Sequence, residues 1–182
     1  MKKSVCVAAF LFCTVLQLRC ALGNRGQEEL TTCAALLPVD AKIELATAYE
    51  DWVILEHDHL YPHQQEVWGP TCPGIAVGEF DGSGEEAYAV LIVRQVAQAK
   101  QAKLLLLEKT NETYTIRVLR EEEEVPSYPV VHREPPGIYR HFYDRQITID
   151  ALDDVFVYEH LEATATVFYY KDGEYQQLLI SD

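Results

Sequence analysis

The sequence has little positive charge. Its 182 residues include 15 Lys and Arg against 29 Asp and Glu, which gives a formal net charge of −14 at pH 7. Nucleic acids and anionic membrane surfaces carry negative charge and would repel such a protein. The composition therefore argues against both as the main partner.

Long apolar runs and recognisable catalytic motifs are also absent. Beyond the N-terminus, no segment is apolar enough for a membrane-spanning helix of about 20 residues. The sequence contains no nucleophile elbow, no Walker loop and no zinc-protease helix. Ser83, Ser127 and Ser181, the serines outside the N-terminal segment, stand in no recognisable nucleophile context. This favours a non-enzymatic protein and leaves any reaction class undefined.

The N-terminal residues have the pattern of an export signal. Lys2 and Lys3 precede an apolar stretch over residues 5–16, and Ala21 and Gly23 supply the small side chains that a signal peptidase reads. We expect a signal peptide over residues 1–23, followed by a single β-rich domain over residues 24–182 in a periplasmic or secreted protein. Lipidation at Cys20 is a less favoured alternative, because the residues before it are not small. Without residues 1–23 the chain keeps 12 Lys and Arg against 29 Asp and Glu, a formal net charge of −17.

Cysteine is scarce in this mature domain. Three of the five cysteines lie within the signal, so only Cys33 and Cys72 remain. Two cysteines in an exported chain most simply form one disulfide. The alternative, a cysteine nucleophile, lacks a recognisable catalytic context.

The hydrophobic pattern predicts an α+β fold that is mainly antiparallel β, with a short N-terminal helix and a C-terminal hairpin. Helical spacing of apolar residues predicts a helix over residues 28–37 that ends at Pro38. Short apolar stretches predict strands at residues 75–78, 88–93, 104–107, 114–119, 146–149, 155–158, 163–170 and 175–180, and their short connections favour antiparallel neighbours.

Three stretches add detail to this prediction. The continuous apolar run of residues 104–107 is typical of a central strand that is covered on both faces. Asp172-Gly173 is a strong signal for a tight hairpin turn. The run of four glutamates at 121–124, followed by several prolines, predicts a long exposed connection over residues 120–137.

An acidic, glycine-rich segment lies between two of the predicted strands. Residues 78–90 read Gly-Glu-Phe-Asp-Gly-Ser-Gly-Glu-Glu-Ala-Tyr-Ala-Val. This segment resembles the calcium-holding loop of FG-GAP and VCBS-type repeats. The resemblance implies a calcium site at Glu79, Asp81 and Ser83, and Glu85 and Glu86 could supply further ligands. It covers about 15 residues and extends loosely to small exported bacterial proteins of unassigned function.

The same segment departs from that family at two of its ligand positions. Ser83 replaces an aspartate, and Ala87 stands where the final aspartate belongs, whereas calcium requires six to eight oxygen ligands. In the alternative interpretation, the glycines only permit a tight turn, and Asp81 and Ser83 bond to the local backbone. Phe80 is then expected to anchor the loop in the core.

Three histidines form a second candidate metal site. His57 and His59 would share one face of a strand, as zinc ligands require, and His63 could supply a third ligand. The alternative is a polar surface segment with three unconnected imidazoles. We favour it, because no catalytic glutamate helix or cysteine pair accompanies the histidines.

These observations leave two main hypotheses of function. The first is an exported, non-enzymatic acidic binding protein, such as an inhibitor or an immunity-type partner of a basic protein, because opposite charges speed association. The second is a metal-dependent hydrolase that uses the histidines or the acidic loop. A calcium-stabilised structural module is an intermediate possibility.

Overall fold

The computed structural model describes residues 32–181. The predicted signal peptide and the first part of the predicted helix at 28–37 lie outside these residues. The helical elements are η1 (Cys33–Leu36), α2 (Val39–Ala48), η2 (His57–His59) and α3 (Pro62–Trp68). The strands are β1 (Val53–Ile54), β2 (Ile75–Gly78), β3 (Ala87–Val96), β4 (Ala99–Thr110), β5 (Thr113–Glu122), β6 (Val130–Glu134), β7 (Gly137–Arg140), β8 (Thr148–Ala151), β9 (Val155–Glu159), β10 (Ala165–Lys171) and β11 (Glu174–Ser181).

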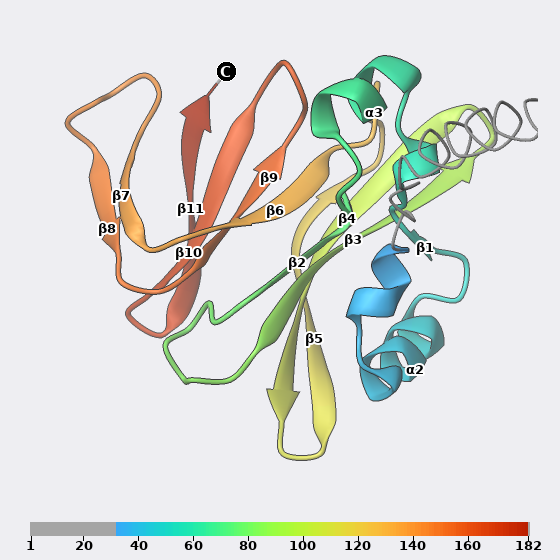
Figure 1. Ribbon diagram of the computed structural model, residues 1–182, viewed down its shortest axis with the longest axis horizontal. Helices are drawn as coiled ribbons and strands as arrows, with labels where there is room; N and C mark the ends of the chain where they lie inside the picture. Colours follow the sequence, from blue (N-terminus) through green and yellow to red (C-terminus); the bar gives the residue numbers. More distant parts are fainter. Residues whose placement is uncertain (1–31, 182) are drawn as a thin grey trace, which may run out of the picture. The chain divides into compact units, whose positions relative to one another are not determined.

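The strands form two antiparallel sheets and one separate pair (Figure 1). The first sheet has the order β1-β3-β4-β5, and β2 also pairs with β3. The second sheet has the order β11-β10-β9-β6, and β7 pairs with β8. The prediction of a mainly antiparallel β fold is therefore confirmed. None of the helices within residues 32–181 is long and apolar enough to cross a membrane.

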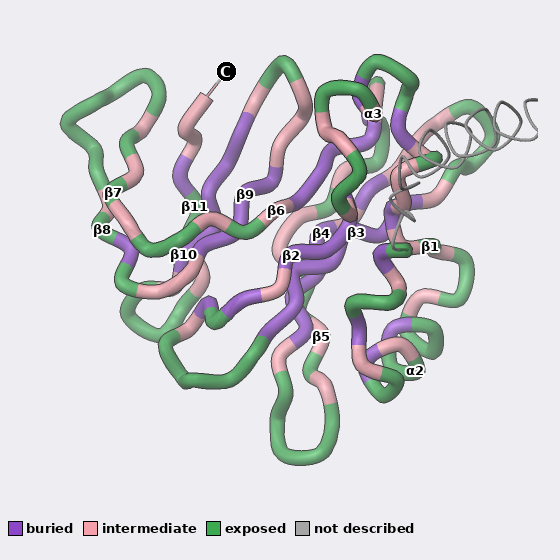
Figure 2. The backbone as a smooth tube through the Cα atoms, in the orientation of Figure 1, coloured by how far each residue is buried: buried purple, intermediate pink, exposed green. Residues whose placement is uncertain are grey.

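The first sheet is covered on both faces. In β4, Leu104 and Leu106 belong to the core cluster shared with Phe156 of the second sheet. Leu105 and Leu107 belong to the cluster that packs against η1 and α2. All four leucines are fully buried, as the continuous run predicts, and Figure 2 shows the buried backbone following these central strands. The outer face of the second sheet packs in turn against β7 and β8.

The C-terminal hairpin also agrees with its prediction. β10 and β11 pair in register from Lys171↔Glu174 onward. The turn residues Asp172 and Gly173 have φ angles of 53° and 89°. Positive φ at both central positions defines the type I′ turn, whose twist matches the flanking strands.

The helical elements differ from the prediction. The described part of the segment predicted as a helix forms a short 3-10 turn, Cys33–Leu36, and the α-helix α2 begins only after Pro38. Pro38 therefore precedes a helix and does not end one. Proline is tolerated there because the first N–H groups of a helix have no partner within the helix.

The segment over residues 120–137 is not a long exposed connection. β5 continues to Glu122, β6 occupies Val130–Glu134, and Val125 and Tyr128 are buried between them. β6 is an edge strand with prolines on both sides. Prolines are compatible with the ends of an edge strand, but in the sequence they indicate a loop, so this strand was not predicted.

The predicted disulfide between Cys33 and Cys72 is present. It joins η1 to the segment before β2 and spans 39 residues of sequence. Cys33 is fully buried, so the bond fixes the helical layer against the first sheet.

Candidate functional site

The acidic, glycine-rich loop connects β2 to β3. It is fixed by Phe80, which is only 1% exposed and lies edge-to-face with Phe156, with ring centres 4.9 Å apart. The expectation that Phe80 anchors this loop in the core is therefore confirmed. Because β2 and β3 are paired up to Gly78↔Ala87, the loop projects from a rigid, buried end of the first sheet.

Hydrogen bonds within the loop involve three of the predicted calcium ligands. The Gly84 amide donates to Glu79 Oε1 at 2.9 Å, and the Ser83 amide donates to Asp81 Oδ1 at 3.0 Å. The Glu85 amide donates to Ser83 Oγ at 3.2 Å. The last two are the local turns in which Asp and Ser side chains bond to the backbone two residues on.

The two glycines in this loop have φ angles of 69° and 82°, in the left-handed region that favours glycine. A Cβ added to Gly82 would lie 3.0 Å from the carboxylate of Asp153. The turn therefore brings a second acidic segment, which immediately precedes β9, against the loop.

A surface pocket of about 470 Å³ lies beside the loop. Its charged lining consists of Glu79, Glu85, Glu86, Asp154 and Arg133. We call the four carboxylates among them the acidic face. Of the predicted calcium ligands, Glu79 and Glu85 line this pocket, whereas Asp81 and Ser83 do not.

Two carboxylates of the acidic face, Asp154 and Glu86, have defined partners outside the loop's own turns. Asp154 accepts the Glu79 amide at 3.3 Å, and Arg133 Nε lies 3.5 Å from the same oxygen. Glu86 accepts a hydrogen bond from the Tyr88 hydroxyl. Burial, and then this hydrogen bond, raise the pKa of Tyr88, so its hydroxyl remains a donor. Sequence reasoning missed Asp154 because it lies 75 residues from Glu79.

Within residues 32–181, no group of three or more His, Cys, Asp or Glu side chains is arranged to hold a metal ion. Calcium binding by this loop stays a prediction from the resemblance. Its carboxylates could attract a cation through charge without forming a ligand cage.

The three histidines do not share one face of a strand. His57 and His59 lie in the 3-10 helix η2, and His63 lies in α3. His59 Nδ1 accepts the Glu56 amide at 2.8 Å as part of a capping box, while His63 stacks on Tyr61. The described geometry gives His59 a structural role at the start of η2.

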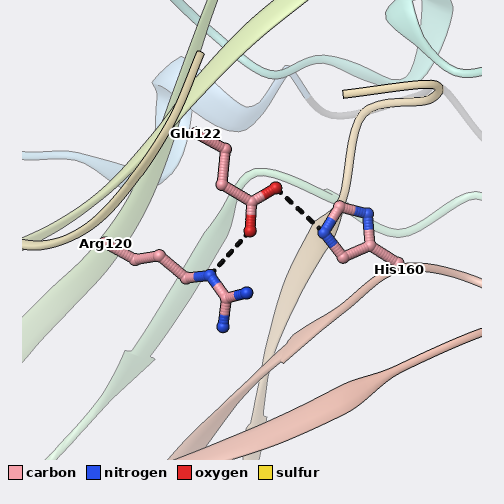
Figure 3. Close-up of polar contacts among 3 residues, drawn as sticks. All are labelled: Arg120, Glu122 and His160. Carbon is pink, nitrogen blue, oxygen red and sulfur yellow. Dashed lines mark hydrogen bonds and ion pairs between the residues drawn. The ribbon is translucent and has the colours of Figure 1, made fainter. Parts of the chain in front are cut away.

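A polar cluster not anticipated from the sequence links the two sheets (Figure 3). Glu122, the last residue of β5, accepts Arg120 Nε at 2.7 Å and lies 3.1 Å from His160 Nε2. His160 directly follows β9 in the second sheet. The side chains of Glu122 and His160 are only 18% and 16% exposed.

The electrostatics of this cluster favour an ionised Glu122. Burial alone raises the pKa of Glu122, but the hydrogen bond and charge of His160, followed by those of Arg120, outweigh it and lower the pKa to about 2. The Arg120 guanidinium carbon also lies 4.9 Å from the ring centre of Tyr158, which is almost fully buried. The cluster is a charged bridge between β5 and the end of β9, and its chemistry is that of a structural ion pair.

Comparison with known proteins gave no match: no protein family, no curated protein and no solved structure is similar to this chain at a significant level.

Proposed function

We propose that the protein is an exported, non-enzymatic binding protein that docks a basic partner on its acidic face. One observation carries the proposal: Glu79, Glu85, Glu86 and Asp154 line a single pocket in which Arg133 is the only cationic side chain. Such a surface attracts Lys- and Arg-rich partners and accelerates their association.

The construction of the acidic face supports binding. Three of its carboxylates belong to a loop that is anchored by Phe80 and closed by its own hydrogen bonds, and the fourth, Asp154, accepts the Glu79 amide of that loop. A surface that is already ordered loses less conformational entropy when a partner binds. The formal charge of −17 expected for residues 24–182 adds attraction at long range. The Cys33–Cys72 disulfide is compatible with an oxidising compartment outside the cytosol.

The proposal is tested with a fluorescently labelled oligolysine peptide and two double variants of equal charge. Glu85→Gln/Glu86→Gln removes two charges from the acidic face. Glu123→Gln/Glu124→Gln removes two exposed charges from the segment after β5. If each carboxylate of the acidic face contributes about 0.7 kcal/mol, the first variant should bind the peptide about tenfold more weakly. The second variant should bind within about twofold of the unmodified protein.

Equal weakening by the two variants would show that the peptide responds only to net charge, and it would refute a docking site at the acidic face. Absence of peptide binding at low ionic strength would refute the proposal as a whole. The same samples are heated with and without calcium. A rise in melting temperature that is lost in Glu85→Gln/Glu86→Gln would instead favour the calcium-stabilised module.

A further inference from the structure

A second pocket lies between α2, η1 and the β1 end of the first sheet. Its volume is about 380 Å³, within the range of small-molecule sites. The residues that line it are Ala34, Lys42, Leu45, Ala46, Tyr49, Trp52, Val53, Ile54, Glu56, His59 and Ile92. None of them belongs to the acidic face.

The walls of this pocket are mainly apolar and aromatic. Leu45 and Tyr49 come from one side of α2 and its C-cap, spaced four residues apart, and Ile54 and Ile92 are partners across β1 and β3. Trp52 stands immediately before β1. Aromatic side chains give a flat ligand a large contact area with little loss of conformational entropy.

Unpaired positive charge gathers around this pocket. Lys42 lines it and forms no ion pair with any residue that the structure describes. The Arg94 guanidinium carbon lies 4.4 Å from the ring centre of Trp52, and its Nε donates to Gln101 Oε1, a neutral group, at 2.6 Å. Lys103 Nζ lies 5.0 Å from the same ring, although it is paired with Glu121. In so acidic a chain, two cations that form no ion pair within residues 32–181, both beside one aromatic pocket, favour an anionic occupant.

The pocket also contains one carboxylate, Glu56, whose oxygens are bonded to the backbone of η1. Both oxygens of Glu56 already accept backbone amides of η1, from Cys33 at 2.7 Å and from Ala34 at 3.2 Å. His59 Nδ1 accepts the Glu56 amide, so the neutral imidazole carries its proton on Nε2 and is itself a donor. With the Cys33–Cys72 disulfide, these contacts fix one wall of the pocket before any ligand binds.

We propose that this pocket binds a small organic anion with a flat apolar body, such as an aromatic carboxylate or sulfonate. The apolar body lies against Tyr49 and Trp52, and the acid group is neutralised by Lys42, while Arg94, stacked on the Trp52 ring, adds positive charge nearby. This site is independent of the acidic face and goes beyond the proposed docking of a basic partner.

The test uses two fluorescent probes of similar shape. Anilinonaphthalene sulfonate carries the acid group, and phenylnaphthylamine is its neutral counterpart. Lys42→Gln should weaken binding of the sulfonate about fivefold and leave the neutral probe within about twofold, since one charge-assisted contact is lost. Ala46→Phe, at an exposed position of α2 that lines the pocket, should abolish binding of both probes.

Two control variants separate this pocket from other surfaces. Lys109→Gln removes an exposed lysine at the end of β4, and Leu152→Ser removes a leucine that is 83% exposed after β8. Both should bind the sulfonate as the unmodified protein does. Far-UV circular dichroism and the urea midpoint establish that each variant is folded.

Three results would overturn the proposal. Sulfonate binding that survives Lys42→Gln and Ala46→Phe, or that is lost in Leu152→Ser, would place the probe elsewhere. Equal affinity for both probes in the unmodified protein would remove the requirement for an anion. Failure of the unmodified protein to bind either probe would show that the pocket is closed to ligands.

Discussion

Glu122 should make the protein lose stability as the pH falls, and Glu122→Gln should remove this dependence. Glu122 is held between Arg120 and His160 at the junction of the two sheets. Its partners lower its pKa from 4.5 to about 2 in the folded protein. A carboxyl group whose pKa is lower when folded stabilises the protein above its unfolded pKa, and it loses this contribution as the pH falls through the folded pKa.

The size of the effect follows from the shift. One pKa unit corresponds to about 1.4 kcal/mol, so the full shift represents about 3 kcal/mol. Solvent reaches part of the cluster, since the Arg120 side chain is 35% exposed, and screening reduces the value to about 2 kcal/mol. About half of this contribution should disappear between pH 5 and pH 3, because that interval covers part of the range between the two pKa values.

The assay is urea unfolding followed by tryptophan fluorescence at these two pH values. Glu122→Gln should lower the free energy of unfolding by about 2 kcal/mol at pH 5 and by about 1 kcal/mol at pH 3. Glu123→Gln is the matched control, because Glu123 is the exposed neighbour, and it should change stability by less than about 0.5 kcal/mol at both pH values. If Glu122→Gln and Glu123→Gln show the same pH dependence, the charged bridge between the sheets does not stabilise the fold as argued.

Two further substitutions test the fold directly. Cys33→Ser/Cys72→Ser should lower the free energy of unfolding by about 4 kcal/mol, because the disulfide spans 39 residues of sequence. Urea unfolding of the unmodified protein with and without reductant provides the comparison. An unchanged urea midpoint in the double variant would contradict the expected loss. Gly74→Ala should lower the melting temperature more than Gly84→Ala does. A Cβ at position 74 would lie 2.2 Å from the Leu55 carbonyl oxygen. A Cβ at position 84 would meet open space, so Gly84→Ala adds only the strain of a φ of 82°, about 1 kcal/mol. Equal melting temperatures for the two alanine variants would refute the close approach at Gly74.

Most of the strands could be predicted because their signals are local. The continuous leucine run in β4 and the Asp172-Gly173 turn each specify their conformation within a few residues. α2 escaped prediction because Val39 and Ile43 are exposed at 68% and 59%, so its apolar residues do not mark one face. α3 has only seven residues, and β6 lies between prolines that indicate a loop in the sequence.

The sites were harder to predict because they depend on contacts between distant residues. The acidic loop could be found in the sequence, but its contact with Asp154 joins positions 75 residues apart. The bridge from Glu122 to His160 spans 38 residues and depends on how the two sheets pack. The pocket at Trp52 requires α2, which the sequence pattern does not reveal.

Because the first sheet is buried on both faces, η1 and α2 must stay attached to it, and a disulfide contributes to this attachment. Leu105 and Leu107 can be buried only if η1 and α2 cover that face, yet α2 has just two buried residues, Ala41 and Leu45. So small an apolar contact provides little hydrophobic stabilisation. The Cys33–Cys72 disulfide and the Glu56 carboxylate, which receives two amides of η1, supply the remaining attachment. The same sparse packing leaves space between α2 and Trp52, so the pocket follows from the way this layer is attached.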